Sequence, residues 1–215
     1  MPDPPQPRRK EPVVKLLSCR NVNQGGESSP LVACGNAGES VDSARLSHVA
    51  RTLEVPFRRG MSFATGSKVL VSACLLGKRC RYDGRENRDG VLERELAQRG
   101  LEALPFCPEE HGGLGTPRPP AWIERSDAGA VIDGEDRVVT DSGADVTEAF
   151  LQGARGALEA CRAHGVSLAY LKERSPSCGV ENTHVEDQLV EGPGVTAELL
   201  QRNGIEVRGV EGRRD

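Results

Sequence analysis

The chain has 215 residues, of which 28% are charged, and a formal net charge of −4 at neutral pH. No stretch approaches the roughly 20 apolar residues that cross a bilayer, so we expect no integral membrane protein. The acidic balance and the absence of a dense Lys/Arg face argue against a nucleic-acid partner. Seven cysteines without a secretory signal indicate reduced thiols, metal ligands or redox groups, and therefore a cytoplasmic location.

The first 60 residues differ in composition from the rest of the chain, because they hold seven of the 14 prolines. They are also rich in Gly, Ser and Asn, and such a stretch buries too little apolar surface to offset the entropy of ordering it. We therefore expect residues 1–66 to be a disordered extension, or translation to start at Met61. Residues 67–215 would then form the folded domain, and Cys19 and Cys34 would have no ligand role.

Short apolar runs from Lys68 onward predict the strands of a buried parallel sheet. The predicted strands cover residues 69–73, 101–106, 166–171 and 205–210. Pro105 indicates that the second strand ends early, because proline cannot donate to a strand ladder. Residues 131–132 and 138–139 flank Asp133 and Gly134, which predicts a hairpin.

Amphipathic segments between these runs predict helices. The longest is opened by a capping box of Asp145 and Glu148 and ended by Gly165. Gly100 and Gly204 end two shorter helices, at residues 92–99 and 195–203. Strands that alternate with helices predict a single α/β domain, with a mainly parallel sheet flanked by helices in a Rossmann-like three-layer arrangement and a small hairpin insertion.

Three cysteines follow the first three predicted strands: Cys74, Cys107 and Cys178. In an open parallel sheet, the loops after the carboxyl ends of the strands gather at one edge, where ligands bind. We therefore expect the three thiols to converge. Thiolates suit iron–sulfur clusters and zinc, and three of them leave one coordination position of the metal open. The alternative is that each is a small buried apolar residue.

Other cysteines and histidines lie near this trio in sequence or elsewhere in the domain. Cys80 is interpreted as a bystander, with a role as fourth ligand left open, and Cys161 as a core residue on an apolar helix face. His111 could complete a zinc site. The other histidines are expected at the surface: His48, His164 and His184.

Two glutamates follow Cys107 across one proline. A carboxylate beside a metal in a dry cleft has a shifted pKa and suits proton transfer. Glu109 is the candidate for this role, whereas Glu110 is expected to be a solvated surface charge. Arg118 is either a substrate contact or part of a loop-ordering ion pair.

Three polar residues surround Cys178 in sequence: Lys172, Ser175 and Ser177. Their ammonium and hydroxyl groups can donate hydrogen bonds to a bound anion or carbonyl. They are therefore candidates for binding and positioning a substrate.

Seven distinctive blocks lie in order between residues 68 and 210: VSACLLG (71–77), CRYDG (80–84), CPE (107–109), GGL (112–114), PRPP (117–120), KERSPSCG (172–179) and GPGVTA (192–197). Together they resemble the bacterial thiouracil desulfidase (TudS-like, YbbK-like) family, long catalogued as a domain of unknown function. The resemblance does not extend to residues 1–66.

This resemblance implies a 4Fe–4S cluster on Cys74, Cys107 and Cys178, with the fourth iron left free. It implies a non-redox reaction in which water replaces the sulfur of a thiocarbonyl such as 2-thiouracil, and sulfide leaves. The expected partner is then a small thiolated base, and we expect binding to neither nucleic acid nor a membrane. The expected roles are catalysis by Glu109 with Ser175 or Ser177, and substrate binding by Lys172 and Arg118.

Trp122 departs from the family, whose members often carry an acidic residue there, and this indicates a different substrate pocket. Two other functions stay open. One is a zinc enzyme or structural zinc domain that adds Cys80 or His111 to the three thiols. The other is a non-catalytic carrier of sulfur or of a cluster.

Overall fold

The computed structural model describes residues 63–213, so the expectations about residues 1–60, Met61, Cys19, Cys34 and His48 lie outside the described residues. The strands are β1 (Lys68–Ser72), β2 (Glu102–Phe106), β3 (Ala121–Ile123), β4 (Val138–Thr140), β5 (Leu168–Lys172), β6 (Asn182–Val185), β7 (Gln188–Glu191) and β8 (Glu206–Val210). The helices are the short 3-10 helix η1 (Ala73–Leu76), α1 (Gly90–Gln98), α2 (Pro108–His111), α3 (Ala128–Asp133), α4 (Thr147–Ala163) and α5 (Val195–Arg202). None of these helices is long and apolar enough to cross a membrane.

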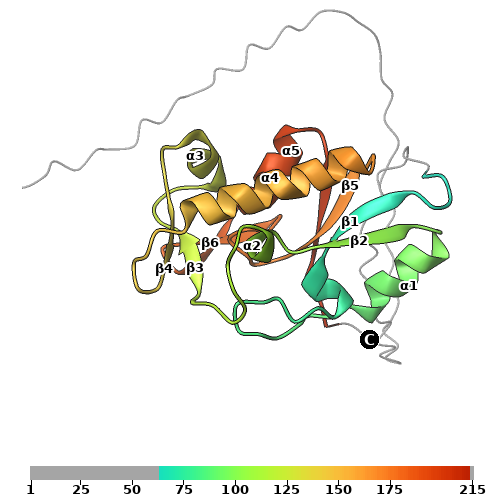
Figure 1. Ribbon diagram of the computed structural model, residues 1–215, viewed down its shortest axis with the longest axis horizontal. Helices are drawn as coiled ribbons and strands as arrows, with labels where there is room; N and C mark the ends of the chain where they lie inside the picture. The colour runs from blue at the N-terminus through green and yellow to red at the C-terminus, as the bar shows by residue number, and fades with distance from the viewer. Residues whose placement is uncertain (1–62, 214–215) are drawn as a thin grey trace, which may run out of the picture. The chain divides into compact units, whose positions relative to one another are not determined.

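The first sheet is wholly parallel, in the order β2-β1-β5-β8 (Figure 1). In its register, Val71 of β1 lies between Pro105 of β2 and Tyr170 of β5. The expectation that Pro105 ends β2 early is wrong, since the strand runs on to Phe106. Proline is tolerated there because β2 is an edge strand, where a missing N–H group costs no ladder hydrogen bond.

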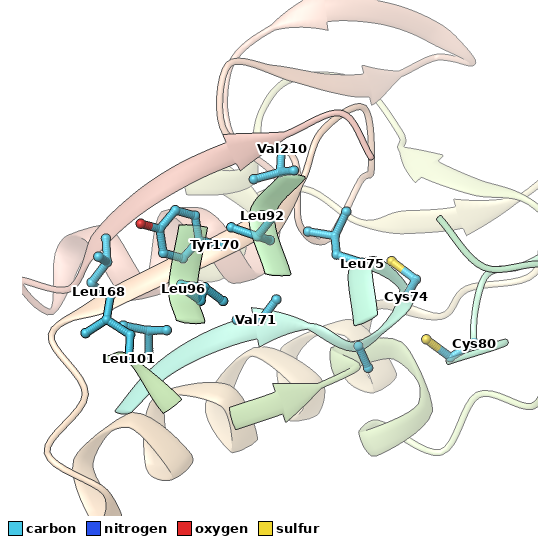
Figure 2. Close-up of a cluster of buried hydrophobic side chains, with 12 residues drawn as sticks. Val71, Cys74, Leu75, Cys80, Leu92, Leu96, Leu101, Leu168, Tyr170 and Val210 are labelled. Carbon is cyan, nitrogen blue, oxygen red and sulfur yellow. The ribbon is translucent and has the colours of Figure 1, made fainter. Parts of the chain in front are cut away.

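Alternate residues of β1 point to opposite faces of this sheet and pack in two separate cores. Val71 packs with α1 residues in one buried cluster, whereas Leu70 packs with α4 and α5 residues in another. Figure 2 shows the first cluster, in which Leu92 and Leu96 of α1 lie beside Tyr170. The sheet is therefore covered by helices on both faces, which confirms the predicted three-layer α/β fold.

The second sheet is mixed, in the order β4-β3-β6-β7. Strand β3 pairs antiparallel with β4 and parallel with β6. The buried residues of this sheet, including Ile123 of β3 and Val185 of β6, pack against Phe150 and Ala154 in the first half of α4. The second half of α4 packs on one face of the first sheet and its first half packs on the second sheet, so α4 holds the two sheets side by side (Figure 1).

The hairpin predicted around Asp133 and Gly134 is wrong. Residues 131–132 belong to α3, whose first turn is capped by Asp127, which accepts a hydrogen bond of 2.9 Å from the Ala130 N–H. Gly134, with φ +79°, ends that helix in the left-handed region. The type I′ hairpin turn that an Asp-Gly pair favours needs both central residues in that region, and Asp133 is helical.

A hairpin does occur later in the chain, between β6 and β7. Its two turn residues are Glu186 (φ +50°) and Asp187 (φ +58°). The sequence did not indicate this turn, because the favoured residues at such positions are Asn and Gly.

The capping box predicted at α4 does not form. The chain from β4 folds back tightly, with Asp145 bridged to Val139, and the helix begins only at Thr147. The Asp145 carboxylate accepts from the Thr147 N–H at 2.9 Å, whereas Glu148 pairs outward with Arg155 at 2.9 Å. The extended pairing of Asp145 therefore moves the N-cap from Asp145 to Val146 and delays the start of the helix by one residue.

Helices α2 and α4 cross at very close range. A Cβ added at Gly153 would overlap the carbonyl oxygen of Pro108, and one added at Gly112 would overlap the carbonyl oxygen of Ala149. Because both obstacles are backbone atoms, only glycine allows this approach. The contact fixes α2, which begins directly after Cys107.

The substitution Gly153→Ala is expected to lower the free energy of unfolding by about 2 kcal/mol. Alanine gains about 1 kcal/mol of helix propensity, but overpacking against a backbone carbonyl costs about 3 kcal/mol and outweighs it. Urea unfolding followed by circular dichroism measures the change. Gly115→Ala is the control, since its Cβ meets no atom within 4 Å. A Gly153→Ala protein as stable as the wild type would contradict the close crossing.

Candidate metal centre and active site

A cavity of about 210 Å³ lies at the carboxyl ends of β1, β2 and β5. Four cysteines line it: Cys74, Cys80, Cys107 and Cys178. The structure therefore brings together the three thiols whose convergence the sheet topology predicts, and their role as metal ligands stays a prediction. It also adds a fourth thiol, Cys80, which the sequence analysis interpreted as a bystander.

Each predicted ligand is positioned by the element that ends just before it. Cys74 lies in η1, directly after β1, and Cys107 is the residue between β2 and α2. Cys178 lies in the loop after β5, where the Ser175 hydroxyl oxygen accepts from the Ser177 N–H at 3.2 Å and the Cys178 N–H at 3.0 Å. Three separate backbone supports thus direct the thiols into one cavity.

Cys80 is a buried member of this group, with 2% of its surface exposed. The Cys107 thiol donates to the Cys80 carbonyl oxygen at 3.8 Å. The hydrogen bond between the Cys80 and Cys107 thiols lowers the pKa of Cys80. The hydrogen bond with Cys74 and burial of the thiol outweigh this effect and raise the pKa of Cys80 to about 12. Figure 2 shows Cys74 and Cys80 together at the end of the first core.

Cys107 and Cys178, which also line the cavity, have raised pKa values as well. The contact with Cys80 and burial raise the pKa of Cys107, and burial raises the pKa of Cys178 to about 12. Without a metal these groups are thiols at neutral pH, so a metal that binds them must displace their protons. Cys161 is fully buried on α4 among apolar residues, as predicted, and does not line the cavity.

The spacing of the thiols distinguishes a single ion from a cluster. Thiolates on one tetrahedral zinc ion lie roughly 4 Å apart, given bonds of about 2.3 Å. Among the described residues, the ligand atoms that all lie within 4.8 Å of one another belong to Cys80, Cys107 and Glu110. The trio of Cys74, Cys107 and Cys178 is more widely spaced, which suits a group of several metal atoms, and its soft sulfur donors fit an iron–sulfur cluster.

His111 does not line the cavity and cannot complete a zinc site there. Its ring lies against Gly156 of α4, with its centroid 5.0 Å from the ring centroid of Phe106.

Glu109 lies on the cavity wall and is held by a guanidinium group. Arg118 donates to the Glu109 carboxylate at 2.7 Å and 2.8 Å, and its side chain is 8% exposed. The same guanidinium donates to the carbonyl oxygens of Cys80 and Gly115, each at 3.1 Å. These contacts give Arg118 a loop-ordering role in which it orients Glu109. Arg118 also lines the cavity, and its role as a substrate contact stays a prediction.

The remaining predicted site residues lie in different places. Lys172 and Ser175 line the cavity. Burial lowers the pKa of Lys172, whose ammonium donates to the Glu173 carbonyl oxygen at 2.6 Å. Ser177 is fully buried, shares a hydrogen bond of 2.9 Å with the Thr196 hydroxyl and does not line the cavity. The structure therefore brings Ser175, but not Ser177, to the site.

Glu173 is a structural residue that the sequence analysis missed. Its buried carboxylate accepts hydrogen bonds of 3.1 to 3.3 Å from the N–H groups of Val180, Glu181 and Asn182. The absence of a side chain at Gly209 leaves room for it. Glu173 therefore fixes the chain that follows Cys178. Its position inside the KERSPSCG block was the available signal.

Aromatic side chains form much of the remaining wall: Tyr82, Phe106 and Trp122. His184 and Asp187, from the β6–β7 hairpin, also line the cavity. The expectation that His184 is a surface residue is therefore wrong, because the second sheet brings it to the site. His164 is exposed, as predicted.

A profile of the 2-thiouracil desulfurase family matches residues 69–211. The chain belongs to this family. The uncharacterized protein YbbK of Bacillus subtilis (strain 168) is 38% identical over 142 residues, which cover 65% of this chain and 93% of YbbK. The solved structure of the 4Fe–4S-dependent thiouracil desulfidase TudS is 44% identical, with a TM-score of 0.56, and the match covers 66% of this chain and 90% of TudS. The family recognised from the sequence blocks is thus confirmed.

Glu173→Gln is expected to lower the free energy of unfolding by about 2–3 kcal/mol, because hydrogen bonds to a charged group are worth about 1.5–3 kcal/mol. The amide keeps one acceptor oxygen but turns an NH₂ group toward backbone donors. Urea unfolding measures the loss, and Glu181→Gln is the control because that side chain is exposed. Equal unfolding midpoints for the two variants would exclude this role of Glu173.

Proposed function

We propose that this chain is a desulfidase of thiolated pyrimidines that uses a 4Fe–4S cluster and water. The reaction converts a ring thiocarbonyl and one water molecule into the ring carbonyl and hydrogen sulfide, without net oxidation or reduction. The observation that carries the proposal is the convergence of three widely spaced thiols on one cavity. Family membership supports it, as does the similarity to TudS, a 4Fe–4S-dependent thiouracil desulfidase.

Cys74, Cys107 and Cys178 would hold the cluster. When bound, the cluster supplies a Lewis acid for the thiocarbonyl sulfur. Four thiols line the cavity, and a cluster held by three of them would keep one iron open to the substrate.

Glu109 is the proposed general base. Its carboxylate lies in the cavity, and the Arg118 guanidinium holds it in one orientation. A carboxylate so placed can accept a proton from water as the water oxygen attacks the ring carbon. Later it can return a proton to the departing sulfur. Arg118 is a positioning residue in this scheme.

Ser175 and Lys172 are the proposed hydrogen-bond donors to the ring. The Ser175 oxygen already accepts from two backbone N–H groups, so its hydroxyl proton can be donated into the cavity. Lys172 offers an ammonium at the same wall. A planar ring can also stack on the aromatic side chains of Tyr82, Phe106 and Trp122, which orients it toward the thiols.

Cys178→Ser is expected to abolish cluster formation, whereas Cys161→Ser is expected to leave it unchanged. Of these two cysteines, Cys178 lines the cavity and Cys161 does not. Anaerobic reconstitution followed by the visible spectrum and by iron and sulfide analysis measures the difference. If both variants lose iron equally, the assignment of Cys178 as a ligand and Cys161 as a core residue fails.

Glu109→Gln is expected to lower kcat for sulfide release by about 10²- to 10⁴-fold, the range for loss of a general base, with the cluster retained. Sulfide release from 2-thiouracil and from 4-thiouracil, assayed anaerobically, measures it. The exposed Glu102→Gln on β2 serves as the control. An unchanged kcat would remove Glu109 from the mechanism, and a loaded protein that releases no sulfide would favour the carrier function.

A further inference from the structure

Cys80, Cys107 and Glu110 form a compact group of ligand atoms that the proposed desulfidase reaction does not use as a unit. One ligand atom of each lies within 4.8 Å of the other two. The three residues come from different local structures, namely the loop after η1, the residue before α2, and α2 itself. Cys80 is 2% exposed, and its neighbour Cys107 is half-buried, so the sulfur side of the group is shielded from water.

This spacing suits one metal ion better than a cluster. Two thiolates and a carboxylate oxygen on a zinc ion lie roughly 3.5–4 Å apart, given bonds of about 2.0–2.3 Å. Small side-chain adjustments would therefore close the observed group around one ion. Two thiolates with one carboxylate favour zinc over magnesium or calcium, which require oxygen ligands. We propose that the cluster-free protein binds a single zinc ion through Cys80, Cys107 and Glu110.

The Glu110 carboxylate already has a cationic partner. The Lys78 ammonium is 2.6 Å from one Glu110 oxygen, and the other oxygen accepts from the Thr116 hydroxyl at 3.1 Å. The Lys78 side chain is 59% exposed, so its ammonium can move into solvent at little cost. Zinc would replace this ammonium as the counter-charge of the Glu110 carboxylate.

The proposed zinc site shares Cys107 with the proposed cluster ligands, because that thiol belongs to both groups. One thiolate cannot complete both sites, so zinc bound here would block cluster assembly. This consequence rests on the proposed function, whereas the zinc site itself does not.

The experiment is a zinc titration of the full-length metal-free protein against a chromophoric chelator. Cys19 and Cys34 are changed to serine in every sample, so that their thiols do not contribute. We expect one zinc ion per chain, with affinity lowered by more than about 100-fold in Cys80→Ser and by about 10- to 100-fold in Glu110→Gln, since each removes a direct ligand. Lys78→Met is expected to raise the affinity several-fold.

Cys178→Ser and Cys161→Ser are the matched controls and are expected to bind zinc as the parent does. If Cys178→Ser weakens zinc binding as much as Cys80→Ser, the ion lies among the predicted cluster ligands and the proposal is wrong. Unchanged affinity in both Cys80→Ser and Glu110→Gln would overturn it as well.

A second measurement separates this site from the desulfidase proposal. Equimolar zinc is expected to slow cluster reconstitution, measured by iron content, in the parent but not in Cys80→Ser. A protein that forms no cluster at all would refute the proposed function, and the zinc site would then be judged by the zinc titration alone. Equal slowing in both proteins would show that zinc competes elsewhere, and the shared role of Cys107 would fail.

Discussion

The parallel pairing of β1 with β2 and β5 is the constraint on which the site depends. Parallel strands end at the same edge of a sheet, so the residues that follow them meet there however far apart they are in sequence. Cys74, Cys107 and Cys178 each follow one of these strands. A shift of register would move a whole strand end by one residue and turn its side chains to the opposite face.

Two structural contacts fix the positions of the residues that follow the strands and line the cavity. The close crossing of α2 and α4, which requires Gly153, fixes the residues after β2, including Glu109. The buried Glu173 carboxylate, paired with three backbone N–H groups, fixes the loop after β5 that carries Cys178. Both contacts therefore determine where the thiols lie.

The sequence was informative wherever a rule of topology or periodicity applied. Strand ends and apolar runs were enough to predict the three-layer fold and the convergence of three thiols. They could not reveal Cys80, because a gap of six residues does not show that a loop folds back into the cavity. They also missed His184, since it arrives on the second sheet, whose packing on α4 has no periodic signal. Asp133 and Gly134 were misread because one residue pair can end a helix or turn a hairpin.

The central claim is that Cys74, Cys107 and Cys178 hold a four-iron cluster, with Cys80 outside its ligand set. Anomalous diffraction at the iron edge, from anaerobic crystals of the reconstituted protein, tests it most directly. The account predicts four iron peaks in the cavity, with the sulfur atoms of those three cysteines alone bound to them. A single metal peak, or a cluster lacking one of these three sulfur atoms, would contradict it.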